Sequence, residues 1–137
     1  MKNNLRTSRL LPLLLTLGLL LSLLVVPAAA WDGSSADSFD GGTGTRTDPY
    51  LISTPAQLAL FRDQVNNGKS GICAKQTANL DMEMRAWNPI GLTSTGFTGI
   101  YDGSGYAIQN LNINRYSTGS SSGSGSTLYG GGLFGVV

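Results

Sequence analysis

Histidine is absent from this sequence of 137 residues, and cysteine occurs once. The lack of histidine removes the commonest general base and the commonest transition-metal ligand, so neither a Ser-His-Asp triad nor a His-Glu-x-x-His zinc site can be assembled. The single cysteine, Cys73, cannot form a disulfide within the chain, and its place between Ile72 and Ala74 predicts a packed side chain. We therefore expect no enzyme activity and no catalytic, cofactor-binding or metal-binding residues.

Carboxylates remain as candidates for catalysis or metal binding. Asp81 and Glu83 would share one face of a strand and, with Asp102, are the candidates for the paired acids of a glycosidase or a polysaccharide lyase. Three further acids that lie close together are Asp32, Asp37 and Asp40. They lack the spacing of a calcium-binding loop. Solvated turn and coil positions are the simpler interpretation for both sets.

The longest apolar run, Leu10 to Val26, follows a basic start and precedes three alanines at 28–30. It is short for a membrane span, and the small residues after it are typical of a signal peptidase site, so cleavage is favoured over an uncleaved anchor. We predict that residues 1–30 are a signal peptide removed before Trp31. The chain is then expected to be secreted or displayed at the cell surface by bacterial-type export.

Charge is scarce in the part that remains after cleavage. Residues 31–137 number 107, and they carry six basic and eight acidic residues, which is a net charge of −2. A protein that binds nucleic acid or a membrane surface needs a basic face, and the scattered charges provide none. We expect no nucleic-acid partner and no membrane contact after the signal is removed.

One helix is predicted near residues 55–67. Thr54 is suited to the N-cap, proline follows at the first helical position, and Gln57 completes a capping box. The apolar residues on one side of this helix are Leu58, Phe61 and Val65. Such a narrow stripe must cover another element, since it cannot form a core alone. Residues 31–47, rich in Gly, Ser and Asp, predict an irregular lead-in.

Short strand-like runs separated by Gly and Asn fill the rest of the chain. They are expected at 50–52, 72–74, 77–82, 87–90, 97–101 and 106–113. The alternation of apolar residues slips between Ile108 and Leu111, which predicts a bend there, and residues 117–127 predict a flexible Ser/Gly loop. Frequent sharp turns favour the start of a parallel β-helix, and a β-sandwich is the alternative.

Four aromatic residues in this part are Trp87, Phe97, Tyr101 and Tyr106. They could form a platform on which sugars stack. Their neighbours are Pro, Gly and apolar residues, which favours packing in the core and at corners.

An ordered series of short motifs carries a family resemblance. It consists of Gly41 to Thr45, Asp48 to Thr54 with Gln57-Leu58, Asn79 to Met82, Trp87 to Gly91, Phe97 to Tyr106, Asn110 to Ile113 and Gly132 to Val136. The series resembles the N-terminal part of bacterial surface proteins with GLUG repeats, and the last motif resembles the repeat itself. The likeness covers nearly all of 41–137.

The resemblance implies a mostly β fold: the start of a right-handed parallel β-helix that a short helix caps at its N-terminal end. The family includes adhesin-like proteins, and the module also occurs beside immunoglobulin-A-cleaving metallopeptidases, but it has no catalytic residues of its own. Residues 48–137 would be the cap and first coils. Because one repeat motif is present where relatives have several, we expect an incomplete or truncated module.

The expected function is that of an exported, non-catalytic, adhesin-like structural module. Its partners would be host or matrix proteins or glycans, bound through the full-length protein. A carbohydrate-binding or polysaccharide-cleaving β-helix is the alternative, and a truncated product without a separate role is a third reading. The apolar residues Leu133, Phe134, Val136 and Val137 are expected near an open strand edge, which would favour self-association.

Overall fold

The computed structural model describes residues 29–92, 94–113, 117–118, 127–128 and 131–137. The predicted signal peptide lies outside these ranges except for its last two residues, and most of the predicted loop at 117–127 also lies outside them. No helix in the described ranges is long and apolar enough to cross a membrane.

Short strands and one helix make up the described fold, which is mostly β. The elements are β1 (Tyr50–Ile52), α2 (Pro55–Asn66), β2 (Ala74–Gln76), β3 (Leu80–Asp81), β4 (Ala86–Trp87), β5 (Tyr101–Asp102), β6 (Ile108–Gln109), β7 (Asn112–Ile113), β8 (Ser117–Thr118) and β9 (Thr127–Leu128).

Two successive lengths of chain lie side by side. We call residues 74–90 layer 1, and residues 101–113 with 131–137 layer 2. β2 pairs with β5, β3 with β6 and β4 with β7, all in parallel, and the paired residues are 27, 28 and 26 positions apart. β1 pairs in parallel with the other edge of β2, at an offset of 24. An isolated parallel bridge joins Ile90 to Phe134.

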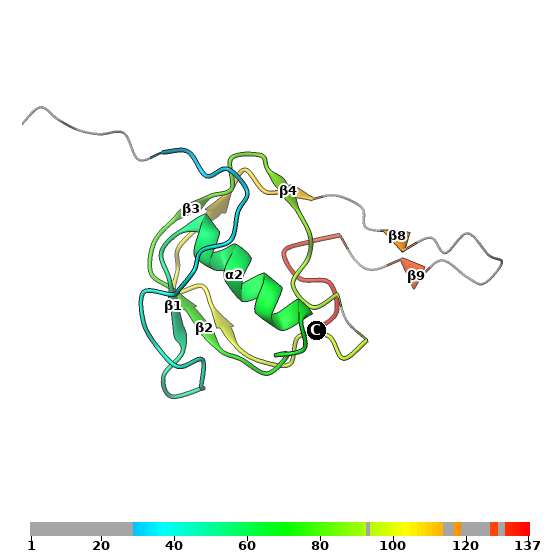
Figure 1. The fold of residues 1–137 in the computed structure, drawn as a ribbon, viewed down its shortest axis with the longest axis horizontal. Coiled ribbons are helices and arrows are strands. Elements are labelled where there is room, and N and C mark those ends of the chain that lie inside the picture. The colour runs from blue at the N-terminus through cyan, green and yellow to red at the C-terminus, as the bar shows by residue number, and fades with distance from the viewer. Residues whose placement is uncertain (1–28, 93, 114–116, 119–126, 129–130) are drawn as a thin grey trace, which may run out of the picture.

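These pairings distinguish between the two architectures that the sequence left open. An antiparallel sandwich needs hairpins and two facing antiparallel sheets. In the described residues the pairs between the layers are parallel, and the antiparallel pair is β8 with β9, which projects away from the layers (Figure 1). The arrangement therefore differs from that of an antiparallel sandwich.

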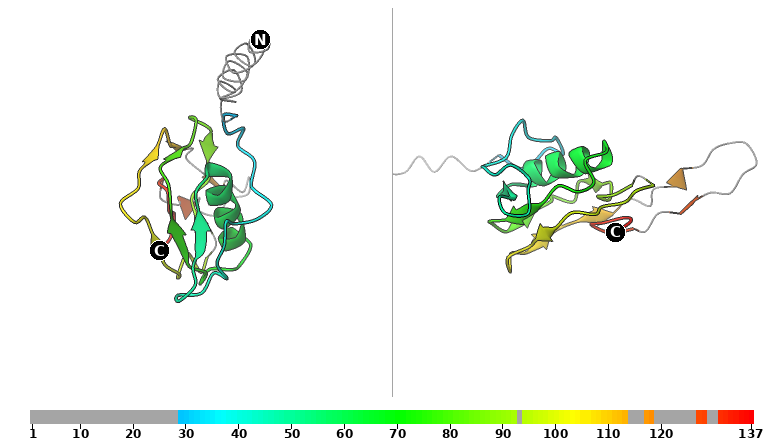
Figure 2. Two further views of the ribbon diagram at one scale, coloured as in Figure 1. Left: turned by 90° about the vertical axis from the view of Figure 1, so that its left-hand side faces the viewer. Right: turned by 90° about the horizontal axis from the view of Figure 1, so that it is seen from below.

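Helix α2 begins as the sequence predicts. The Thr54 side chain accepts a hydrogen bond from the Gln57 backbone N–H, and the Gln57 side chain accepts one from the Thr54 N–H. The predicted apolar stripe, Leu58, Phe61 and Val65, is fully buried. Figure 1 shows α2 across the ring of strands, and the right-hand view of Figure 2 shows layer 2, in yellow, on the side away from α2.

The far end of α2 is fastened to layer 1 by its last residue. The Asn66 side-chain amide donates to the Pro89 carbonyl at 3.0 Å. Its oxygen accepts from the backbone N–H groups of Gly91 at 2.8 Å and Leu92 at 3.0 Å. One side chain thus fixes the helix end against the turn that closes layer 1.

The core lies between α2 and layer 1. The inward side chains of layer 1 are buried: Ala74, Gln76, Leu80, Met82, Trp87 and Ile90. Gln76 is the polar member of this set, and its amide donates to the carbonyls of Ala78 at 2.8 Å and Ala107 at 3.1 Å, while its oxygen accepts from the Tyr101 hydroxyl at 3.0 Å. Burial therefore leaves none of the polar atoms of Gln76 unpaired, as a stable core requires.

Several predicted strands are shorter or shifted in the structure. β1 matches its prediction, and the predicted bend between 106 and 113 is confirmed, because Asn110 adopts a left-handed φ of 53° between β6 and β7. The run at 72–74 is displaced to 74–76, because the Cys73 N–H bonds to the Gly44 carbonyl in the lead-in. The run at 77–82 contracts to 80–81, whereas the runs at 87–90 and 97–101 become two-residue strands that are also shifted, at 86–87 and 101–102.

The close approach of residues 99 and 72 predicts unequal effects for two nearby glycine substitutions. A Cβ at Gly99 would overlap the Ile72 carbonyl, whereas a Cβ at Gly103 would meet no atom within 4 Å. We expect Gly99→Ala to lower the free energy of unfolding by at least about 1–3 kcal/mol through overpacking. Gly103→Ala should change it by less than about 0.5 kcal/mol. Urea unfolding followed by tryptophan fluorescence measures both, and equal effects would contradict the close contact between Gly99 and Ile72.

Candidate functional site

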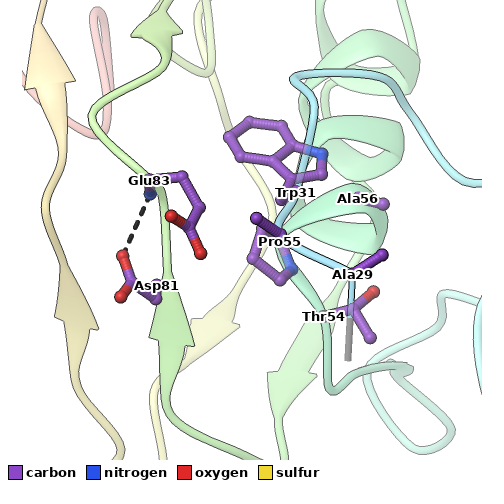
Figure 3. A pocket seen from close by; sticks show the side chains of 8 residues that line it. Ala29, Trp31, Thr54, Pro55, Ala56, Asp81 and Glu83 are labelled. Carbon is purple, nitrogen blue, oxygen red and sulfur yellow. Dashed lines mark hydrogen bonds between the residues drawn. The ribbon is translucent and has the colours of Figure 1, made fainter. Parts of the chain in front are cut away.

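One pocket of about 400 Å³ lies between the start of α2 and the end of β3 (Figure 3). It is lined by Ala29 to Trp31, Thr54 to Ala56, Asp81 and Glu83. The pocket joins the start of the lead-in to residues about fifty positions later. No local motif indicates such a contact, and the sequence did not predict it.

Trp31 is held firmly at one wall of this pocket. Its side chain is 9% exposed and packs with the core. The indole N–H donates to the Ser34 carbonyl at 2.7 Å, and the Trp31 carbonyl accepts from the Arg85 side chain at 3.4 Å. The residue predicted to start the mature chain is therefore part of the folded body.

Asp81 and Glu83 do not share a strand face as the sequence predicts. Glu83 is not on the strand face shared with Asp81, because it lies after β3 with a left-handed φ of 52°. Asp81 accepts hydrogen bonds from the Asn110 side chain at 2.8 Å and the Glu83 N–H at 3.0 Å, and these bonds lower the pKa of Asp81. Asp102 lies on β5 and accepts from the Ser104 N–H at 2.8 Å, outside this pocket.

The lowered pKa of Asp81 is the opposite of what the catalytic acid of a glycosidase needs. Paired catalytic acids need one carboxyl group whose pKa is raised so that it stays protonated. The hydrogen bonds at Asp81 act in the opposite direction and keep it ionised. Its role is to fix a turn and to join the two layers.

The acids of the lead-in also serve local structure. Asp32 accepts from the hydroxyl and the N–H of Ser34, which lowers the pKa of Asp32. Asp40 accepts from the Ser53 hydroxyl and from the Gln57 amide at 2.7 Å, and both bonds lower its pKa. In the part of the chain that the structure describes, no three His, Cys, Asp or Glu residues gather where they could hold a metal ion.

The aromatic residues are divided between core and surface. Trp87 and Phe97 are buried, and the Phe97 ring stacks on Phe134 with centroids 5.4 Å apart. Tyr101 is half-buried, which raises the pKa of its hydroxyl. Tyr106 is 45% exposed. Core packing is confirmed for Trp87 and Phe97, so these four rings do not present a shared face on which a sugar could stack.

Layer 2 carries several exposed apolar residues. Its exposed apolar residues are Tyr106, Ile113, Val136 and Val137. In the described residues β5, β6 and β7 each pair along one edge, the edge toward layer 1. Leu133 and Phe134, which the sequence placed at an exposed edge, are half-buried, because Phe134 packs against Phe97 and Tyr101.

Comparisons with known proteins give two partial matches. No model of a known protein family matches the chain, and no solved structure matches it. A protein of Evansella cellulosilytica named "Putative Gly-rich membrane protein" is 40% identical over 85 residues, which cover 58% of this chain and 10% of that protein. Halomucin of Haloquadratum walsbyi is 34% identical over 91 residues, which cover 61% of this chain and 1% of halomucin. The chain thus corresponds to a tenth or less of each relative.

The bonds at Asp40 predict a pH dependence of stability. Because the folded-state pKa of Asp40 is lowered, its contribution is present above the ordinary aspartate pKa of about 4 and is lost as pH falls through the folded value. Asp40→Asn should reduce stability at pH 6 and reduce it less at pH 3. Urea midpoints at the two pH values measure this difference. Asp37→Asn removes the same charge from the same segment and should have little effect at either pH.

Proposed function

We propose that this chain is an exported, non-catalytic structural module that forms the N-terminal cap and first coils of a right-handed parallel β-helix in an adhesin-like surface protein. The parallel pairing at three places, with offsets of 26 to 28 residues, is the observation that carries the proposal. A nearly constant offset at successive strands is what a chain wound in stacked turns would produce. Crossover connections between parallel strands are nearly always right-handed, which supports that hand.

The proposal that β1 and α2 form a cap is supported by the difference between the β1 end and the layer 2 end of the stacked strands. The outer edge of β1 is covered by the lead-in, where the Asp40 N–H bonds to the Leu51 carbonyl and the Leu51 N–H to the Gly41 carbonyl. Helix α2 covers the interior at the same end. Layer 2 lies at the other end, where β5, β6 and β7 have no second strand partner among the described residues. Repeat proteins close their ends with atypical units and extend by adding further repeats, which fits this polarity.

The relatives support a surface location. Their names describe one as a membrane protein and the other as a halomucin, and each is many times longer than the matched segment. A cap at the start of a long exported protein would match such a short part of each. Host or matrix proteins or glycans would then be bound by the full-length protein, through coils or domains beyond the cap.

A non-catalytic role is the better proposal than polysaccharide cleavage. Asp81 is held ionised, and Asp102 lies on a different strand pair, opposite Lys75. Trp87 and Phe97 are buried, so they are not available to a sugar. The walls of the layers therefore lack the clustered acidic and aromatic surface that a carbohydrate enzyme would need. A polysaccharide-degradation assay that showed turnover by the exported chain would contradict this proposal.

Engineered disulfides test the winding directly. In a Cys73→Ala background, Lys75→Cys with Asp102→Cys joins β2 to β5, and Asp81→Cys with Gln109→Cys joins β3 to β6. Adjacent positions on parallel strands are within reach of a disulfide. We expect both pairs to oxidise readily, separately and together, as measured by mass spectrometry of the intact protein.

Shuffled pairs at the same four positions serve as controls. Lys75→Cys with Gln109→Cys, and Asp81→Cys with Asp102→Cys, place each cysteine opposite the wrong strand. Stacked turns predict slow or absent bridging for these pairs. Equal oxidation of matched and shuffled pairs would reject the winding, whereas export of the chain is tested separately by its presence in the culture medium or on the cell surface.

The edge of layer 2 that has no strand partner among the described residues predicts self-association of the isolated module. Ile113 on β7 is 40% exposed and Val137 is 85% exposed, and unpaired edges with apolar neighbours favour pairing with another chain. Ile113→Lys should weaken association by at least about tenfold, because a charge would enter the contact. Sedimentation measures the change. Met84→Lys is the matched control, since Met84 is 61% exposed at a corner of layer 1. A monomer whose melting does not depend on concentration would contradict the prediction.

A further inference from the structure

We propose that folding closes the predicted signal peptidase site, so that the bond between Ala30 and Trp31 must be cut before the lead-in docks on the rest of the protein. The inference rests on the proposed export and on cleavage before Trp31. Hydrolysis of this bond consumes one water. Ala30 leaves with residues 1–30 and carries the new carboxyl group, and Trp31 keeps the amino group. Docking and cleavage therefore compete for the same short segment.

The residue directly after the bond is part of the core. The Trp31 side chain is 9% exposed and belongs to the same buried apolar cluster as Leu58 and Trp87. Its indole N–H donates to the Ser34 carbonyl at 2.7 Å, and its own carbonyl accepts from the Arg85 side chain at 3.4 Å. Trp31 is thus held through its side chain and through its backbone.

The residues before the bond lie against the folded protein. Ala29 and Ala30 are exposed, but both line the pocket at the start of α2, together with Trp31 and the residues from Thr54 to Ala56 (Figure 3). One side of the bond therefore faces the helix start at close range. An enzyme would have to approach in the space that this wall occupies.

The chain that follows Trp31 is fastened to the same helix. The Ser35 hydroxyl donates to the Asp63 carboxylate, and the Ala36 N–H donates to the Ala56 carbonyl at 2.9 Å. The segment that would have to enter a protease after the bond therefore lies along α2 and is bonded to it.

These contacts protect the bond because a protease binds an extended segment on both sides of the bond that it cuts. Nicks in folded proteins accordingly fall in exposed loop tips. At a protected bond the rate follows the population of molecules in which the segment is open. Opening here returns the Trp31 ring to water and breaks its hydrogen bonds, so this population is small.

The position of the partners in the sequence gives the enzyme time to act. The Arg85 side chain that holds the Trp31 carbonyl lies 54 residues further along the chain. The site stays open until the chain up to this point has folded, since a contact between distant residues forms late. A chain that docks first keeps residues 1–30, including the apolar run Leu10 to Val26, which is at the short limit of a membrane span. The order of the two events thus decides between a released form and a form held at the membrane.

Cleavage of the purified full-length precursor tests the inference. The precursor is kept in detergent micelles and given to a bacterial signal peptidase either after refolding or directly from urea. We expect the refolded precursor to be cut at least about tenfold more slowly, as measured by mass spectrometry of the products. Equal rates would overturn the inference and leave cleavage intact. Failure of the enzyme to cut the unfolded precursor before Trp31 would instead overturn the predicted cleavage itself.

Two variants test whether docking of Trp31 provides the protection. Trp31→Ala removes the buried ring and should raise the rate for the refolded precursor at least about fivefold. The rates for the unfolded precursors with and without this substitution should match, which excludes a preference of the enzyme for either residue. Arg85→Ala removes the bond to the Trp31 carbonyl from an exposed position, so the fold persists, and it should raise the rate by a smaller factor. No increase in either variant would overturn the role of Trp31.

Phe39→Ala is the matched control in the lead-in. The Phe39 ring also packs against the core and stacks on Tyr50 with centroids 4.1 Å apart, but it lies further along the chain from the bond. Its removal should raise the rate for the refolded precursor by less than half of the factor for Trp31→Ala. Equal factors would show that any loosening of the lead-in suffices, and would overturn the assignment of the closure to Trp31.

Discussion

The burial of one helix face against the first layer is the contact on which the rest of the structure depends. Strands of two or three residues form too few hydrogen bonds to be stable alone. Their pairing persists because inward side chains such as Leu80, Met82 and Trp87 lose contact with water when α2 covers them. The cap at Thr54 and the three bonds of Asn66 fix both ends of the helix, so the whole apolar stripe stays over the layer.

Burial decreases from layer 1 to layer 2. The buried Leu80 pairs with the half-buried Ile108, and the buried Trp87 pairs with Ile113, which is exposed. Regions with less burial open more easily, so layer 2 is the less stable part. A further turn of chain on layer 2 would bury these side chains as layer 2 buries part of layer 1. In the proposed β-helix, the lower burial of layer 2 would follow from the direction in which repeats are added.

The sequence predicted the elements that depend on local chemistry and missed those that depend on distant partners. The capping box, the stripe on α2 and the bend at Asn110 all follow from neighbouring residues, and all are present. Strand limits were less accurate, because a run such as 72–74 ends where a partner is available, and Cys73 finds its partner in the lead-in. The pocket beside Trp31 gives no local signal, since its walls come from three separate segments.

Side chains at the corners help to specify the register between the layers. The Asn110 amide reaches Asp81 at 2.8 Å, and the Asn112 amide reaches the Met84 carbonyl at 3.0 Å. The Asn79 side chain accepts from the Ala107 N–H at 2.9 Å. A slip of one residue would break these three bonds and also turn the inward side chains outward. Because the register is set at corners and in the core, the outward faces of the strands are free to vary, and a surface protein can change those faces without changing its fold.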